Sequence, residues 1–365
     1  MDLVKWLAVA VVVAIASWML LGLEVPTATT EDVWVDNGDV RLAGTLTLPA
    51  GPGPHPGVIL VSGSGPQDRD EAMPTIPGYR PFAVISEHLV DEDLAVLRYD
   101  DRGVGESTGD NATASTGDLA TDAEAVFEYL RNRPEIDATR VGILGHSEGA
   151  MIAAMIAARN PNVAFVVSMG GSAADNYELL LRQEERLVEA SGMSEAEKAE
   201  SMAMTRTALE LTRDANWTEL EPFLRETIEA QIQQMPAERR AALGDLETFT
   251  DQAVEQTLDH HRNWLHFFLA YDVAADWAAV DVPVLVLLGE LDTQVDAAQA
   301  RASFEAAFAQ GGNERVTYAV FPKANHLFLT AVTGHPSEYA AMDKTFVPGF
   351  LETISEWLLA VVDER

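Results

Sequence analysis

A serine stands at the centre of the sequence Gly-His-Ser-Glu-Gly at 145–149, between a short apolar run at 140–144 and an alanine-rich run at 150–159. The change from a strand-like to a helix-like pattern predicts a sharp turn, which forces its central residue into a strained backbone conformation. Glycines two positions to either side remove side chains that would collide in such a turn. A hydroxyl held there lies at a helix N-terminus, which favours developing negative charge. Ser147 is therefore a candidate nucleophile.

Acyl transfer by a serine needs a base to take the hydroxyl proton and an acid to orient that base. His326 comes a few residues after the last β-rich run and is the candidate base. Asp292 lies in a Gly-Glu-Leu-Asp turn directly after the apolar run at 284–288, where the carboxyl end of a strand would place an acid. Glu290 in the same turn is the alternative acid. His335 is the alternative base, although its Gly-His-Pro setting is typical of a turn.

The oxyanion formed by such an attack needs two N–H donors that are held in place in advance. The residue after the nucleophile, Glu148, supplies the first, and the glycine-rich loop at 62–70 is expected to supply the second through Ser64. This loop lacks the lysine of a P-loop and the spacing of a dinucleotide fingerprint, so it is not predicted to bind phosphate. The turn at 100–107 is predicted to be structural, with Arg102 joining loops through carboxylate hydrogen bonds.

The rest of the chain must position these residues, and it alternates short apolar runs with helix-like stretches. Nearly all-apolar runs are typical of parallel strands buried on both faces, which need helical crossovers. Runs at 33–35 and 41–48, joined at Asn37-Gly38, predict an antiparallel hairpin before them. The predicted parallel strands lie at 57–61, 95–99, 141–144, 163–169, 284–288 and 316–321, and the predicted helices at 82–91, 119–131, 150–159, 297–309 and 350–362.

One acidic, almost strand-free stretch interrupts this alternation and predicts a helical cap at 176–276. Its last part, 260–268, is much richer in aromatic residues, so we expect it to pack onto the sheet edge that carries the candidate site. The core is accordingly predicted at 32–175 and 277–365.

The charge of the chain limits its partners. Acidic residues outnumber basic residues by 58 to 24, which gives a formal net charge of −34 and excludes nucleic acid as a predicted partner. Such a surface suits a salt-adapted protein, because salt screens self-repulsion within about 10 Å, or an ordinary acidic extracytoplasmic protein, and the sequence leaves both open. No metal-ligand spacing and no cofactor motif is present, so neither a metal nor a cofactor is expected.

The N-terminus predicts an export element. Residues 6–23 form an apolar run long enough to cross a bilayer as a helix, preceded by Lys5 and followed by acidic residues, which places the remainder outside the cytoplasm. The run is longer than the usual core of a signal peptide and lacks a small-x-small site, so we favour a membrane anchor at 1–25 over a cleaved signal followed by secretion. Without cysteine, neither a lipoprotein anchor nor a disulfide is expected.

Taken together, the motifs resemble those of the α/β-hydrolase superfamily, and within it a bacterial esterase group with a serine-aminopeptidase-type or lysophospholipase-like domain. The resemblance implies an α/β fold with an eight-stranded, mostly parallel sheet, helices on both faces and a helical cap inserted after the sixth strand. In that family the first motif usually begins with His-Gly, whereas this chain has Ser62-Gly63. The motifs that carry the resemblance are Ser-Gly-Ser-Gly-Pro-Gln-Asp-Arg-Asp at 62–70, Tyr-Asp-Asp-Arg-Gly-Val-Gly-Glu-Ser at 99–107, Gly-His-Ser-Glu-Gly at 145–149, Gly-Glu-Leu-Asp at 289–292 and Asn-His at 325–326.

The first functional hypothesis is a serine esterase that cleaves a small-molecule acyl ester through an acyl-enzyme, with Ser147, His326 and Asp292 as its triad. A serine peptidase of the aminopeptidase type uses the same machinery, and an acyltransferase or thioesterase would need a further acceptor site. A non-catalytic binding protein on the same fold is the alternative of another class. The natural substrate and the oligomeric state are not determined by the sequence.

Overall fold

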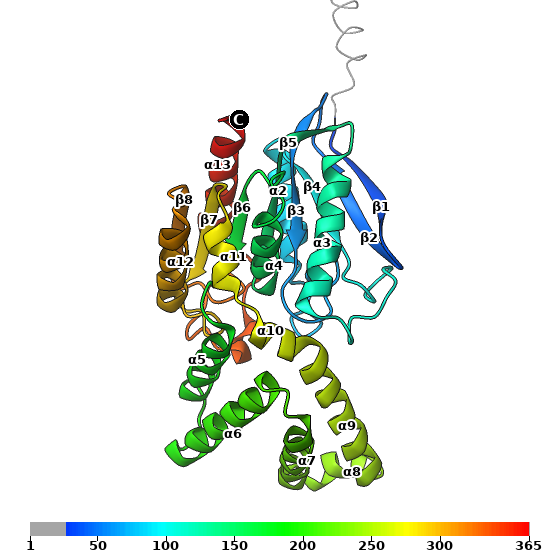
Figure 1. Ribbon diagram of the computed structural model, residues 1–365, viewed down its shortest axis with the longest axis vertical. Coiled ribbons are helices and arrows are strands. Elements are labelled where there is room, and N and C mark those ends of the chain that lie inside the picture. Colours follow the sequence, from blue (N-terminus) through cyan, green and yellow to red (C-terminus); the bar gives the residue numbers. More distant parts are fainter. Residues whose placement is uncertain (1–26, 365) are drawn as a thin grey trace, which may run out of the picture.

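The protein is described from a computed structural model, for residues 27–364. The predicted anchor or signal at 1–25 lies outside these residues and stays a prediction; within 27–364, no helix has both the length and the apolar character needed to span a membrane. Eight strands form one sheet in the order β1-β2-β4-β3-β5-β6-β7-β8, which confirms the predicted sheet (Figure 1). The strands are β1 Thr29–Asn37, β2 Val40–Leu48, β3 His55–Val61, β4 Ala95–Tyr99, β5 Ile136–His146, β6 Val166–Met169, β7 Val284–Gly289 and β8 Val316–Phe321.

The sheet is parallel from β4 to β8, and the antiparallel β1–β2 hairpin extends it along β4. The prediction placed the hairpin turn at Asn37-Gly38, one residue too early. Asn37 still pairs with Val40, so the turn consists of Gly38 and Asp39, and Gly38 takes a positive φ of 61°. Glycine adopts that conformation without the steric cost that a Cβ brings.

Alternate residues of the buried strands face two separate cores. In β3, Val58 and Leu60 pack in the core covered by α2 and α13, whereas Ile59 and Val61 pack in the core covered by the helices of the other face. This two-sided burial explains why the strands are apolar throughout rather than alternating. The helices on the first face are α2 Pro81–Asp91 and α13 Phe350–Asp363, and those on the second are α3 Thr116–Arg131, α4 Glu148–Ala157, α11 Val273–Ala279 and α12 Ala297–Gly311 (Figure 1).

The predicted helical insertion follows β6, and every regular element between β6 and β7 is a helix. Figure 1 shows α6 to α9 standing away from one end of the sheet, while α5 and α10 lie next to the core. Small apolar clusters of their own join these helices. The division of the chain into domains at 176 and 276 stays a prediction. The cap helices that precede α11 are α5 Asn176–Glu189, α6 Glu195–Arg213, α7 Trp217–Gln234, α8 Ala237–Ala242, α9 Leu246–His260, the π-helix η1 His261–Leu265 and α10 His266–Ala270.

Candidate active site

Ser147 occupies the turn between β5 and α4, with φ 53° and ψ −116°. A non-glycine residue at positive φ is strained and persists only where the surrounding structure enforces it. Here the enforcement is close packing: a Cβ on Gly145 would lie 2.0 Å from the carbonyl oxygen of Gly149, and a Cβ on Gly149 would lie 2.2 Å from that of Val61. Both flanking glycines are therefore needed for the chain to turn here, as the sequence predicts.

His326 and Asp292 meet in the loops that follow β8 and β7. The Nδ1 atom of His326 lies 2.8 Å from Oδ2 of Asp292, and their exposed fractions are only 4% and 1%. The other carboxylate oxygen of Asp292 accepts the N–H groups of Gln294 and Val295, both at 2.8 Å. Since an ionised carboxylate only accepts, the proton of a neutral His326 is on Nδ1, and the lone pair of Nε2 is free to receive another proton.

Four of the five predicted site residues line one cavity of about 270 Å³. The loops that carry them follow β3, β5 and β8, parallel strands whose carboxyl ends lie at one edge of the sheet. Asp292 lies behind the imidazole rather than at the cavity wall. The four residues are Ser64, Ser147, Glu148 and His326.

The two alternative residues are engaged elsewhere. Glu290 is exposed, and its Oε2 accepts the backbone N–H of Lys323 at 2.9 Å. His335 caps the short helix Pro336–Ala341, with its Nδ1 2.8 Å from the hydroxyl of Ser337. Neither lines the cavity that contains Ser147. The geometry thus favours Asp292 as the acid and His326 as the base.

The candidate oxyanion loop, residues 62–70, passes directly against Ser147, the candidate nucleophile. A Cβ on Gly63 would lie 3.2 Å from the Cβ of Ser147. The N–H of Gly63 is donated to Oε1 of Glu71 at 2.8 Å, so it is not free to bind a ligand. Within residues 27–364, the N–H groups of Ser64 and Glu148 have no hydrogen-bond acceptor. These are the two donors that the sequence predicts.

The sequence matches the model of a known protein family. A family model described as serine aminopeptidase, S33, matches residues 79–331, well over half of the chain. The chain belongs to this family of α/β-hydrolases. The matched residues begin just before α2 and end after the loop of His326. They include all three candidate catalytic residues, Ser147, Asp292 and His326.

Individual relatives are similar over shorter stretches. Esterase EstD of Thermotoga maritima is 38% identical over 119 residues, which cover 33% of this chain but only 28% of EstD. Human acyl-coenzyme A thioesterase 1 is 31% identical over 135 residues, which cover 37% of this chain and 28% of that protein. Among solved structures, esterase Pf2001 of Pyrococcus furiosus is 16% identical with a TM-score of 0.52, covering 92% of this chain and 90% of that one. This last likeness shows the fold.

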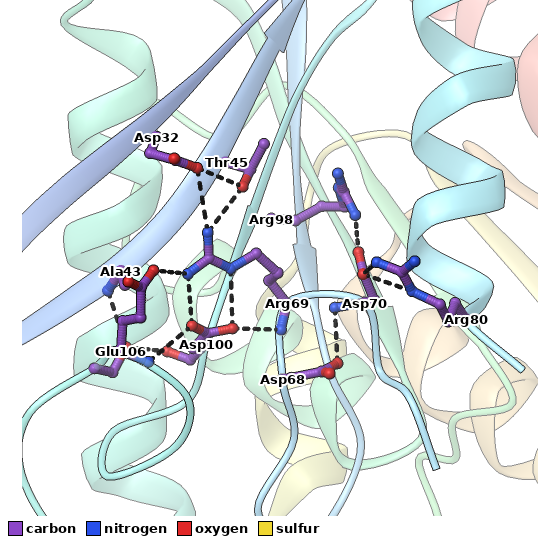
Figure 2. Close-up of polar contacts among 11 residues, drawn as sticks. Asp32, Ala43, Thr45, Asp68, Arg69, Asp70, Arg80, Arg98, Asp100 and Glu106 are labelled. Atoms are coloured by element: carbon purple, nitrogen blue, oxygen red, sulfur yellow. Dashed lines mark hydrogen bonds and ion pairs between the residues drawn. The ribbon is translucent and has the colours of Figure 1, made fainter. Parts of the chain in front are cut away.

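Ion pairs fix the oxyanion loop of this hydrolase to the sheet. The guanidinium of Arg69 binds both carboxylate oxygens of Asp100, at 3.0 and 2.6 Å, while Arg80 and Arg98 both pair with the buried carboxylate of Asp70 (Figure 2). Burial alone would raise the pKa of Asp100, but the hydrogen bonds from Arg69 hold it below its ordinary value. The loop is therefore positioned by charge-assisted hydrogen bonds, which are stronger than neutral ones.

The neighbouring turn is structural, as predicted. Arg102 binds both carboxylate oxygens of Asp122 on α3, at 2.6 and 2.9 Å. Asp101 accepts the hydroxyl of Ser62 at 3.1 Å and the N–H of Gln67 at 3.0 Å. Burial raises the pKa of Asp101 to about 8, and the nearby carboxylates of the site add to the rise. Asp101 thus joins the turn to the loop at 62–70 through hydrogen bonds, a contact that was not predicted from the sequence.

The cap reaches the site through Trp264, as its aromatic composition predicts. The indole N–H of Trp264 donates to Oε1 of Glu148 at 2.8 Å, and the hydroxyl of Thr116 donates to the same oxygen at 2.6 Å. The ring stacks on His260 and Phe268, with centroids 5.0 and 4.9 Å away. Trp264 lies within the π-helical turn η1, and such turns often occur at functional sites. Glu148 thus joins the cap to the elbow, although the sequence suggested only its backbone role.

Replacing Trp264 with phenylalanine tests this connection. The change keeps an aromatic ring for stacking but removes a hydrogen bond to a buried carboxylate, so we expect kcat/KM to fall about ten-fold, in line with a charged hydrogen bond. Trp217→Phe is the matched control, because Trp217 packs within the cap against the cluster of Leu220, Leu224 and Leu258 and does not line the catalytic cavity. Equal losses of kcat/KM in the two variants would contradict a specific role for the Trp264–Glu148 bond.

Proposed function

We propose that this hydrolase cleaves carboxylic esters through an acyl-enzyme intermediate. The observation that carries the proposal is that Ser147 stands in a strained elbow and shares one cavity with His326, whose other ring nitrogen is bound to Asp292. Ser147 Oγ attacks the ester carbonyl as Nε2 of His326 takes its proton, and the same proton then passes to the leaving alcohol. A water molecule then attacks the acyl-enzyme, with His326 again accepting and donating the proton, and the carboxylic acid is released. The N–H groups of Ser64 and Glu148 hold the oxyanion in both steps.

A second function, aminopeptidase-like cleavage of amides, has one observation in its favour. The carboxylate of Glu148 is at the cavity wall, it is buried, and its Oε2 has no hydrogen-bond partner within residues 27–364. A free carboxylate oxygen next to the nucleophile would suit the ammonium group of an aminoacyl substrate. The similarity to EstD favours the ester reading over this one.

Two substrate series separate these functions. We expect higher kcat/KM for p-nitrophenyl esters of increasing acyl length than for aminoacyl arylamides, and the best chain length reports the size of the acyl site. Faster cleavage of arylamides would replace the esterase proposal with a peptidase. Folded protein that turns over neither series and does not react with a fluorophosphonate would contradict the hydrolase mechanism.

A larger cavity next to the first bears on thioester substrates. It measures about 1040 Å³, shares Ser64 and Trp264 with the catalytic cavity, and lies between the loop at 110–114 and α9. Its charged lining residues are Asp110, Glu255 and Asp259, of which Asp259 pairs with Arg262, and no lysine or arginine lines it among the described residues. Carboxylates would repel the phosphates of coenzyme A.

We therefore expect neutral thioesters to be better substrates than acyl-coenzyme A. With the same acyl group, kcat/KM for the N-acetylcysteamine thioester should exceed that for the coenzyme A thioester about ten-fold at low salt, and the ratio should shrink as salt screens the charges. Glu255→Gln should narrow the ratio, while Glu247→Gln, an exposed change on the same helix that does not line the cavity, should not. Preference for acyl-coenzyme A would contradict this reading of the cavity.

A further inference from the structure

A second histidine–carboxylate pair lies beside the candidate triad. The ring of His146, the residue before the nucleophile, is 2% exposed and has its centroid 4.9 Å from that of His326. Its Nδ1 lies 2.7 Å from Oε1 of Glu71, and its Nε2 lies 3.1 Å from the backbone carbonyl oxygen of His326. His146 lies within the wall of the catalytic cavity.

The pair joins three segments that the reaction needs. Oε1 of Glu71 accepts the N–H of Gly63 as well as that of His146, so one carboxylate oxygen holds both the oxyanion loop and the elbow. The other side of the His146 ring holds the loop of His326 through its carbonyl. Glu71 itself has a positive φ of 54°, a strained conformation that other contacts must enforce.

The hydrogen-bond partners of His146 favour its charged form. A carbonyl oxygen and an ionised carboxylate can only accept, so both ring nitrogens of His146 must donate, which requires the imidazolium form. Burial alone would lower the pKa of His146, but the charge and hydrogen bond of Glu71, the carbonyl of His326 and the charge of Asp292 together raise it. Two other ionisable groups, Tyr79 and Asp101, interact electrostatically with Glu71. Burial raises the pKa of both, which favours their uncharged, protonated forms.

We propose that Glu71 and His146 form a charged positioning pair, which fixes the oxyanion loop and the loop of the catalytic base relative to Ser147. In this proposal neither residue contacts the reacting atoms. The pair keeps the N–H of Gly63 occupied, so that the next amide, that of Ser64, is presented to the cavity. Such preorganised donors act chiefly in the transition state, so loosening them lowers kcat more than it raises KM. The inference rests on the proposed ester hydrolysis, which supplies the readout.

Glu71→Gln removes the charge while keeping the shape. A glutamine oxygen in the position of Oε1 can still accept the N–H of Gly63 and that of His146 Nδ1, but it no longer supplies the negative charge that favours the imidazolium. We expect kcat for a p-nitrophenyl ester to fall about ten- to a hundred-fold with little change in KM, because the oxyanion donors are less well held. His146→Gln should cost a similar factor, and the double variant should cost little more than either, since coupled residues are not additive.

The pH profile separates a charged pair from a merely structural one. A histidine whose pKa is raised in the folded state keeps its charge below that pKa and loses it as the pH rises through it. In the unaltered protein kcat should therefore hold through neutral pH and fall on the alkaline side as His146 loses its proton. In Glu71→Gln this alkaline limb should move to lower pH. Additive losses in the double variant, or an alkaline limb at the same pH, would overturn the proposal.

A measurement that does not depend on activity protects the test against variants that fail to fold. The ¹⁵N shifts of His146 in the unaltered protein at pH 7 should show both ring nitrogens protonated, whereas a neutral ring would overturn the proposal. Failure of the ester mechanism itself is recognised separately, by absence of turnover and of phosphonate labelling in the unaltered protein.

Discussion

Replacing Ser147 with alanine should lower kcat for ester hydrolysis by roughly 10³-fold or more, because the residual rate comes only from substrate binding and the oxyanion donors. The variant should also lose covalent labelling by a fluorophosphonate. Its stability should change little, since alanine at a φ of 53° carries much the same backbone strain as serine. Kinetics with a p-nitrophenyl ester, intact-mass analysis after labelling and thermal unfolding measure the three quantities.

Peptide mapping of the labelled protein gives the sharper form of this test. In the unaltered protein the phosphonate should be attached to the peptide that contains Ser147. Ser172, which lines the same cavity, supplies the matched control, because Ser172→Ala should keep both labelling and turnover. Labelling of folded Ser147→Ala at another serine would mean that the nucleophile is elsewhere.

Asp292→Asn should have the second large effect, a fall in kcat of about 10⁴-fold with KM little changed. The asparagine oxygen can still accept the N–H groups of Gln294 and Val295, so its amide nitrogen faces His326 and donates to Nδ1. That hydrogen bond selects the tautomer protonated on Nε2, which cannot take the proton of Ser147. The geometry of the loop is preserved and only the proton is misplaced.

Glu290→Gln is the control for this change, because Glu290 lies two residues away in the same turn but binds the backbone of Lys323. Its kcat should stay within about two-fold of the unaltered protein, as expected for an exposed side chain away from the site. If instead Glu290→Gln abolishes turnover and Asp292→Asn does not, the assignment of the acid is wrong.

Glu148 lines the catalytic cavity and binds the cap through its side chain. Its N–H is free at the cavity, while its carboxylate receives the indole of Trp264 and the hydroxyl of Thr116. A displacement of the cap therefore acts on a residue next to the nucleophile. This arrangement connects the helical insertion to the residue next to Ser147.

Most secondary structure could be predicted because it follows from local pattern. The strands β4 and β8 have the predicted bounds, since each is a short β-rich run between helix-like stretches. Helix α3 begins three residues earlier than predicted, at Thr116, because Ser115 and Asp118 form a capping box. That signal was present in the sequence, as a serine followed three residues later by an acid. Strand β6 begins later than predicted, at Val166.

By itself the sequence determined the elements, the strained turn around Ser147 and the chain order of Ser147, Asp292 and His326, because apolar period and glycine spacing act over a few neighbouring residues. Only the tertiary structure decided which groups near that turn have partners. The N–H of Gly63 donates a hydrogen bond to Glu71, and Glu71 and Glu148 line the cavity. The contacts of Glu71 with His146 and of Glu148 with Trp264 span 75 and 116 positions, and their energies depend on burial, which no local pattern encodes.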